Sequence, residues 1–445
     1  MWLLSCTASS HRLSQAASKR TLVVMSSSCA STSPAAQEPL GAKWHIVLAG
    51  HFDPATIGRL MGGNCESALT RLSGPPGVPI HHLACGFAKR GLRTTLLGGL
   101  RGSADACVQA SPLGAILYKR RGRAAWVLDG LRTERNAILH HLRRIAPSVV
   151  HAHWTWEASR AVADWDGPKV LTVHDAAWEC IRLGTSWKWG PLAHASNLRW
   201  LANTSAVLKH FRHVIAVSPF VESYLRLKHG FQGEIRVIPN AIPALADCPR
   251  VPGVFPKADR LTFGCYGSPG RLKNIDAALS AFRRIQQHLP NARLVVFGGD
   301  WQRVRSHYAD LPVEFRGAQA HRDFLEQLVS EVDIWVHPSR TEAHPIAICE
   351  AIQAGCAVIA GRASGGVPWT LDYGRAGILI DIEKPVEIAQ AMLALAHNRQ
   401  LALDLVSYGR QMIRNRFNPD RVIEMHLDYY REIINAWRIS RTPFA

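Results

Sequence analysis

The chain has 445 residues, of which 47% are hydrophobic, so it can form two domains with separate cores. No apolar run reaches about 18 residues and the ten cysteines are scattered, which argues against a membrane-spanning helix and a disulfide framework and fits a reducing cytoplasm. The net charge of +18 is uneven, because residues 44–250 hold 25 Lys and Arg against 13 Asp and Glu, whereas residues 251–445 hold 23 against 20. A basic first half favours anionic partners, and a solvated basic surface is the alternative.

Residues 1–43 are rich in Ser and Ala, and no acidic residue precedes Glu38. This composition resembles a transit peptide, but a misassigned start with initiation at Met25 or later explains it equally well. We expect disorder in this extension.

The first domain is expected to begin with a buried strand at residues 45–50. A loop of about 25 residues follows, and its length indicates a functional segment. Helical periodicity then covers residues 78–90, with Gly91 as the stop, and a second strand is expected at residues 94–97.

Strands at residues 149–154 and 170–175 both end in polar side chains, which is how open parallel sheets build sites at their carboxyl edge. His174 is the strongest candidate in this domain. Of His151 and His153, one is expected to brace the sheet. A metal pair is the alternative, and it lacks a third ligand.

Seven of the fourteen tryptophans lie within residues 154–200, interleaved with basic residues. This pattern suits a surface that docks on an anionic membrane, an acceptor-stacking site or a core, and the basic charge of the domain favours the membrane. Nucleic acid is not expected as a partner, because no binding module is recognised.

Residues 241–260, rich in Pro and Ala, are expected to be a linker between domains at 44–240 and 261–417. In the second domain, a strand at 261–267 is followed by a loop that carries Arg271 and Lys273. Further strands are expected at 293–299 and 313–317.

Residues 333–339 form a short apolar run ended by Pro338 and Ser339, as in a buried strand of a parallel sheet. Glu342 follows in a loop, and a helix is expected from Pro345 with Glu350 inside it. Side chains lean toward the helix N-terminus, so Glu350 is directed into the crevice below Glu342.

Free N–H groups of residues 344–347 at the start of that helix favour a phosphate. Carboxylates can bind the hydroxyls of a sugar and backbone amides can bind phosphate, so the two together suggest a nucleotide sugar as the ligand. The alternative is that one glutamate caps the helix and the other is a solvated charge.

These motifs together resemble the donor site of the group 1 glycosyltransferases, that is, glycosyltransferase family 4, which is retaining and has the GT-B fold. The residues that carry the resemblance are Pro338, Ser339, Glu342, Glu350, Ala351, residues 355–360, Gly365 and Gly366. The resemblance implies that Glu342 contacts the donor sugar and Glu350 the nucleotide ribose.

The resemblance also implies that Lys273 and Arg271 bind the donor diphosphate and that His174 lies beside the donor sugar. Gly77 matches a glycine whose backbone faces the donor phosphates. The N-terminal residues of the 345–353 helix, with His344, Pro345 and Ile346, are expected to bind donor, and Arg316 is expected near the base.

Two positions depart from the family pattern. The arginine that the family commonly has about five residues before the lysine falls on Ser268, and an acid commonly found after the glycine pair is replaced by Trp369. These departures keep a non-catalytic scaffold in polysaccharide assembly open as an alternative, beside a phosphorylase or epimerase of the same architecture.

The expected fold is α/β, with two Rossmann-like doubly wound domains facing a cleft and a C-terminal helix, within residues 418–445, that crosses back to the first domain. The expected reaction is retaining transfer from a nucleoside diphosphate sugar to a carbohydrate or lipid-linked acceptor, without metal or another cofactor. The expected location is the cytoplasm, at the inner face of a bacterial plasma membrane.

Overall fold

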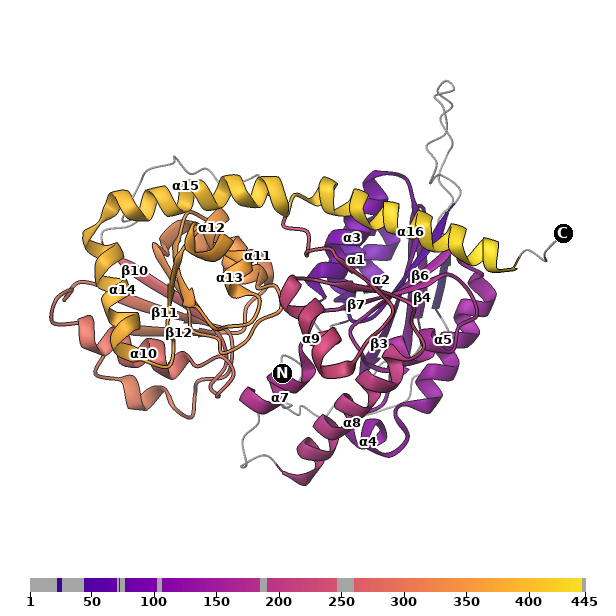
Figure 1. Cartoon of the computed structure of the whole chain (residues 1–445), viewed down its shortest axis with the longest axis horizontal. Coiled ribbons are helices and arrows are strands. Elements are labelled where there is room, and N and C mark those ends of the chain that lie inside the picture. The colour runs from indigo at the N-terminus through magenta and orange to yellow at the C-terminus, as the bar shows by residue number, and fades with distance from the viewer. Residues whose placement is uncertain are drawn as a thin grey trace, which may run out of the picture.

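The computed structural model describes residues 22–25, 44–69, 72, 77–101, 106–184, 190–245 and 260–441. Within these ranges the chain forms two α/β domains side by side, joined along one edge by the helices α15 and α16 (Figure 1). We call residues up to 245 the first domain and residues 260–417 the second domain.

The first domain is built on a nine-stranded sheet of order β1-β4-β5-β3-β2-β6-β7-β8-β9, in which only the β4–β5 pair is antiparallel among the described strands. The strands are β1 Leu22–Met25, β2 His45–Ala49, β3 Arg93–Arg101, β4 Ala106–Ala110, β5 Leu113–Arg120, β6 Val149–His153, β7 Lys169–Val173, β8 His213–Ala216 and β9 Glu234–Val237. The helices are α1 Pro54–Met61, α2 Gly63–Leu69, α3 Val78–Lys89, α4 Arg123–Asp129, α5 Arg132–Ile145, α6 Glu157–Ala163, α7 Ala177–Gly184, α8 Pro191–Leu208 and α9 Pro219–His229.

The second domain has a parallel six-stranded sheet of order β12-β11-β10-β13-β14-β15. The strands are β10 Thr262–Tyr266, β11 Arg293–Phe297, β12 Val313–Gly317, β13 Ile334–His337, β14 Ala357–Gly361 and β15 Ile378–Ile380. The helices are α10 Ile275–Ile285, α11 His321–Glu331, α12 Ile346–Gln353, α13 Val367–Thr370, α14 Pro385–His397 and α15 Arg399–Arg416, with 3-10 turns at Arg305–Tyr308 and Asp372–Gly374.

Both sheets are buried on both faces. In β11, Leu294 and Val296 pack into one apolar cluster and Val295 and Phe297 into the other. The residues of β2 divide between two clusters in the same way. Continuous apolar runs in parallel strands are the sequence sign of this arrangement, because helices cover each face.

The chain passes between the domains twice, and the two passages touch. The N–H of Ile242, after the first domain, donates to the carbonyl of Phe417, at the end of α15, over 2.9 Å. The last helix, α16 Pro419–Arg441, then packs against α3 and places Tyr429, Tyr430 and Ile433 in the core of the first domain. The predicted fold class, with its crossing helix, is confirmed.

The loop expected between the first strand and residue 78 is wrong in part, because α1 and α2 occupy much of it. Asp53 caps α1 by accepting from the Thr56 N–H at 3.0 Å, and Pro54 opens the helix. An aspartate directly before a proline was the available start signal.

Within the expected N-terminal extension, the structure describes Leu22–Met25 as the strand β1, parallel to β4, where disorder was expected. The rest of residues 1–43, and most of the expected linker, lie outside the described residues.

Candidate active site

Glu342 forms an ion pair with Lys273 at the carboxyl edge of the second sheet. Lys273 precedes α10 and Glu342 lies between β13 and α12, yet Lys273 Nζ is 2.5 Å from Glu342 Oε1. His337, the last residue of β13, donates from Nε2 to the same oxygen at 3.2 Å. Burial would raise the pKa of Glu342, but the Lys273 charge and the His337 hydrogen bond hold it well below its usual range. The Glu342 carboxylate is therefore ionised at any physiological pH.

The Gly365–Gly366 turn fixes the loop that carries Glu342. The Gly366 N–H donates to the Glu342 carbonyl at 2.7 Å. A Cβ on Gly366 would lie 1.9 Å from the Ala343 carbonyl oxygen, and Gly365 adopts a φ of +63°. Only glycine fits both positions, which explains the glycine pair in physical terms.

Glu350 is almost buried in α12, with 8% of its surface exposed. Its Oε1 accepts a 2.6 Å hydrogen bond from Nε2 of His321, the first residue of α11. Burial lowers the pKa of His321, but the hydrogen bond and charge of Glu350 outweigh it and leave the pKa above its ordinary value.

His174 follows β7 in the first domain and belongs to a row of histidines. Its Nε2 lies 2.9 Å from Nδ1 of His153, and the two rings are stacked. Burial, with the charges of His426 and His344, lowers the pKa of His174 to about 3. The imidazole is therefore neutral at pH 7. A small cavity beside it is lined by residues that include Thr172, His174 and Asn240.

His151 braces the sheet, as one of the two alternatives predicted. Its nitrogens lie 2.5 Å from Tyr430 Oη of α16 and 2.5 Å from Thr172 Oγ1 of β7. Both nitrogens are therefore occupied, and the described residues contain no group of three or more ligands suited to a metal ion.

The side chain of His344 turns toward the interdomain passage. Its Nδ1 accepts from the Asn240 N–H at 3.1 Å, and its ring packs on Phe417 and Trp369. Burial and the Arg416 charge lower the pKa of His344 to about 3. The imidazole is thus neutral and is held against the interdomain passage through Nδ1, while its Nε2 has no hydrogen-bond partner among the described residues.

Pro345 is the N-cap of α12 and Ile346 its first residue. The helix therefore starts one residue later than predicted. Its first N–H groups have no intrahelical partners and lie in the segment that also holds Glu342. Trp369 stacks under the Arg416 guanidinium, 4.7 Å from the ring centroid, so the aromatic residue in place of an acid has a packing role.

Gly77 is the N-cap of α3 and touches the segment after β2. A Cβ there would lie 1.9 Å from the His51 carbonyl oxygen. Arg271 is exposed, and its carbonyl accepts from the Arg340 guanidinium. No side-chain partner of Arg271 occurs in the described part of the chain.

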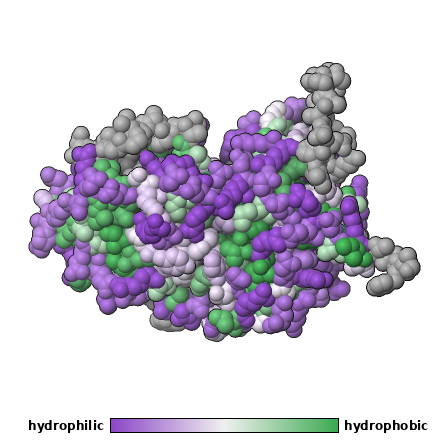
Figure 2. Space-filling model, turned by 45° about the horizontal axis from the view of Figure 1, so that its top comes forward, coloured by the Kyte–Doolittle hydropathy of each residue, from purple (hydrophilic) through white to green (hydrophobic). Residues whose placement is uncertain are grey.

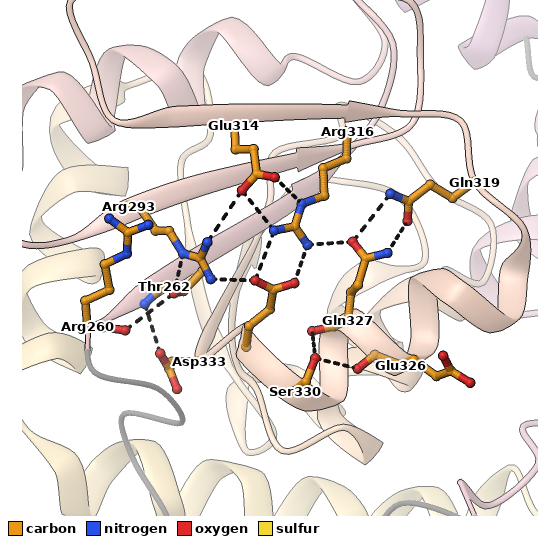
Figure 3. Close-up of polar contacts among 11 residues, drawn as sticks. Arg260, Thr262, Arg293, Glu314, Arg316, Gln319, Glu326, Gln327, Ser330 and Asp333 are labelled. Atoms are coloured by element: carbon orange, nitrogen blue, oxygen red, sulfur yellow. Dashed lines mark hydrogen bonds and ion pairs between the residues drawn. The ribbon is translucent and has the colours of Figure 1, made fainter.

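Arg316 is not brought together with the Glu342 and Lys273 pair. Its guanidinium binds Glu314 of the same strand and Glu331 at the end of α11, and Arg293 shares Glu331 (Figure 3). Because α11 runs back toward the amino edge of the sheet, these contacts draw Arg316 away from the carboxyl edge where ligands bind. The sequence could not predict this direction, since Glu331 follows 15 residues later in another element.

His321 and His337 are side chains at the second-domain site to which the sequence analysis gave no ligand-site role. For His321 and His337, a signal was present: each lies at the carboxyl end of a strand or the start of the next helix. Their partners are set by the fold.

Two family models match the chain. Residues 260–398 match the model described as glycosyl transferases group 1, and residues 77–244 match the model of glycosyltransferase family 4. None of the helices in the described ranges combines the length and apolar character that crossing a bilayer needs.

A GDP-mannose-dependent alpha-(1-6)-phosphatidylinositol monomannoside mannosyltransferase of Mycobacterium tuberculosis is 25% identical over an aligned length of 263, and the match covers 54% of this chain and 68% of that protein. Sucrose-phosphate synthase of Thermosynechococcus elongatus has a TM-score of 0.69 at 19% identity, covering 88% of this chain and all (100%) of the other. Anabaena Alr3699/HepE, solved with UDP and glucose, has a TM-score of 0.60 at 14% identity, covering 87% and 100%. The chain belongs to the group 1 glycosyltransferases of family 4, enzymes of the GT-B fold that transfer a sugar from a nucleotide sugar.

Proposed function

We propose that the protein moves a hexosyl group from a nucleoside diphosphate sugar to its acceptor with retention of configuration. The observation that carries the site assignment is the Lys273–Glu342 pair, because it places a cation and an ionised carboxylate 2.5 Å apart at the ligand-binding edge of the second sheet. Glu342 holds hydroxyls of the sugar and Glu350 those of the ribose. Retention rests on the family resemblance.

Lys273 acts on the departing diphosphate. Negative charge grows on the leaving oxygen in the transition state, and a fixed ammonium there stabilises it more than it stabilises the ground state. Arg271, exposed in the same loop, and the first amides of α12 supply further positive charge. Three such groups can neutralise the diphosphate, so we propose that the reaction proceeds without metal.

His174 contacts the sugar from the first domain. It is neutral at pH 7 because burial lowers its pKa to about 3. A neutral imidazole whose Nε2 is engaged by His153 has Nδ1 left for a sugar hydroxyl. Gly77 supports the donor phosphates through its backbone at the start of α3.

We propose a lipid-linked acceptor and peripheral docking at the inner face of a bacterial plasma membrane. The support is a set of exposed apolar side chains on three neighbouring helices, α4, α7 and α8, which we call the apolar face: Leu128, Trp178, Leu192 and Leu198. Figure 1 shows these three helices together at the lower edge of the first domain. The side seen in Figure 2 is mainly hydrophilic, with separate hydrophobic patches on both domains. Of the other tryptophans between residues 154 and 200, Trp156 and Trp200 stack inside the domain, so part of this group is core. Trp187 and Trp189 lie outside the described residues.

The lipid assignment also draws on the M. tuberculosis relative, whose name states a phosphatidylinositol monomannoside substrate. The excess of basic residues in the first domain suits an anionic headgroup layer.

The test is thermal stabilisation by UDP, GDP and ADP and by their glucose and mannose esters, each with and without EDTA. We expect one nucleotide to raise the Tm of the wild type. This rise should be smaller in Glu350→Ala and Lys273→Ala and unchanged in the control variants Glu326→Ala and Lys209→Ala. Glu326 and Lys209 are exposed residues of the same types. No shift with any nucleotide would favour the scaffold alternative, and turnover that needs phosphate or no acceptor would favour a phosphorylase or an epimerase.

With the donor known, the anomeric configuration of the product, read by NMR, decides retention. An inverted product would contradict the proposed stereochemistry while leaving the donor site in place.

A further inference from the structure

His321 is the residue whose contact with the site is not explained by helix formation or core packing. It is the first residue of α11, with 45% of its side chain exposed, so the fold does not require an imidazole there. Nevertheless its Nε2 lies 2.6 Å from Oε1 of Glu350, a carboxylate on a different helix. The ring is supported from behind by Phe324, onto which it stacks at 6.5 Å.

The hydrogen bond from His321 occupies one carboxylate oxygen of Glu350 and leaves the other oxygen able to bind a ligand. Among the described residues, Oε1 of Glu350 accepts a hydrogen bond from His321, and Oε2 accepts none. The backbone contact next to this carboxylate, from the Ala354 N–H to the Glu350 carbonyl, belongs to the end of α12 and does not involve the side chain. A carboxylate with one oxygen tied and one oxygen open has a fixed orientation and can still accept a hydrogen bond.

The first domain offers no competing hydrogen bond to the Glu350 carboxylate from His82. His82 of α3, in the first domain, lies within electrostatic range of Glu350, but its Nδ1 donates to the Ala241 carbonyl at 2.7 Å. His82 is therefore committed to the interdomain passage. His321 remains the side chain that orients the carboxylate.

We propose that His321 is a positioning residue for nucleotide recognition: by tying Oε1 of Glu350, it aims Oε2 at a ribose hydroxyl of the nucleoside diphosphate. This inference rests on the proposed function, in which Glu350 binds the ribose. A free Glu350 would have to lose side-chain rotamer freedom on binding, and pre-orientation removes that cost. The effect is on donor binding in the ground and transition states alike, so it changes KM and leaves kcat.

The experiment uses the full chain and measures Kd by calorimetry for whichever of UDP, GDP and ADP the wild type binds most tightly, and for its 2′,3′-dideoxy form. His321→Leu should weaken binding of the ribonucleotide about tenfold, the effect of one hydrogen bond to a charged group. It should change binding of the dideoxy nucleotide by less than about twofold, because no ribose hydroxyl is left to recognise.

His321→Gln carries an amide N–H close to the position of Nε2 and should restore most of the affinity. His307→Leu, at an exposed histidine of the same domain, is the matched control. Steady-state kinetics of His321→Leu should show a donor KM raised about tenfold with kcat within about twofold of the wild type.

The outcomes separate this inference from the proposed function. Wild type that binds none of the three nucleotides overturns the proposed function. Wild type that binds one of them, with His321→Leu equal to it, overturns the role of His321 alone. An equal loss for the ribo and dideoxy forms, or a loss in His321→Gln as large as in His321→Leu, also contradicts positioning through Glu350.

Discussion

Lys273 and Glu342 form an ion pair across 69 positions of sequence, with Nζ 2.5 Å from Oε1 and about five-sixths of each side chain buried. Removal of the cation leaves an ionised carboxylate without its main partner. We expect Lys273→Met to lower the free energy of unfolding by about 3 kcal/mol at pH 7. Urea denaturation measures this free energy. The double variant Lys273→Met with Glu342→Gln should recover most of the lost stability, because it leaves no unpaired charge.

The pH dependence of that variant has a definite sign. In the wild type, the depressed pKa of Glu342 contributes stability above the unfolded-state pKa, and this stability is lost as the pH falls through the folded-state value. Without Lys273, burial raises the pKa of Glu342, so the variant should approach the wild type in stability between pH 7 and pH 5. A gap that stays constant over this range would contradict the ion-pair explanation.

Lys273→Ala tests the leaving-group role in turnover. We expect kcat to fall by about 100-fold, much more than the donor KM rises, since the contact binds the donor and strengthens in the transition state. Lys209→Ala is the exposed control. An unchanged kcat with weaker donor binding would show that Lys273 binds substrate and transition state equally.

Gly366→Ala tests the support of the Glu342 loop. The added Cβ would sit 1.9 Å from the Ala343 carbonyl oxygen, so the loop must move. We expect a loss of at least about 2 kcal/mol in the free energy of unfolding, together with weaker donor binding. Gly122→Ala is the control, because nothing lies within 4 Å of its Cβ position. Equal stability and activity in the two variants would mean that the loop adapts freely.

Acid should destabilise the protein below about pH 6.5, the ordinary histidine pKa. Burial lowers the pKa of His344 to about 3 and of His426 to about 4, so both remain neutral in the folded state while the unfolded chain takes up protons. Stability that is present above pH 6.5 is lost as the pH falls, by about 2 kcal/mol per residue at pH 5.

Urea denaturation of the wild type and of His426→Leu at pH 7 and pH 5 measures this dependence. The variant should lose about 2 kcal/mol less between the two pH values. An exposed control, His307→Leu, should follow the wild type, and an equal drop in all three proteins would assign the acid sensitivity to other groups.

Membrane docking predicts co-sedimentation with anionic phosphatidylglycerol vesicles, weakened by salt and by a charge in the apolar face. Leu198→Glu should reduce the bound fraction about fivefold or more. The substitution replaces an apolar side chain that would insert into the membrane with a negative charge that anionic lipids repel. Leu227→Glu is the matched control, since Leu227 is also highly exposed but lies on α9. An equal effect of both substitutions would indicate a general charge effect.

Strands and the donor loop could be predicted from local patterns. Residues 293–297 and 333–337 are short apolar runs buried on both faces. Glu342 and Glu350 are predicted from the strand, loop and helix pattern, and Lys273 from the family resemblance. What decides the rest is contact between distant elements. The side chain of Arg316 is oriented by its ion pair with Glu331, that of His344 by the Asn240 N–H, and that of His321 by Glu350. The sequence around each of these residues does not indicate which way its side chain points.

The helix α16 has a consequence for the way the protein is made. Tyr429, Tyr430 and Ile433 complete the core of the first domain, and Tyr430 holds His151 in the middle of its sheet. A growing chain therefore has the whole second domain available before the first domain can close its own core. The half that is synthesised first is the half that finishes folding last, and loss of the final 25 or so residues would damage the beginning of the protein more than its end.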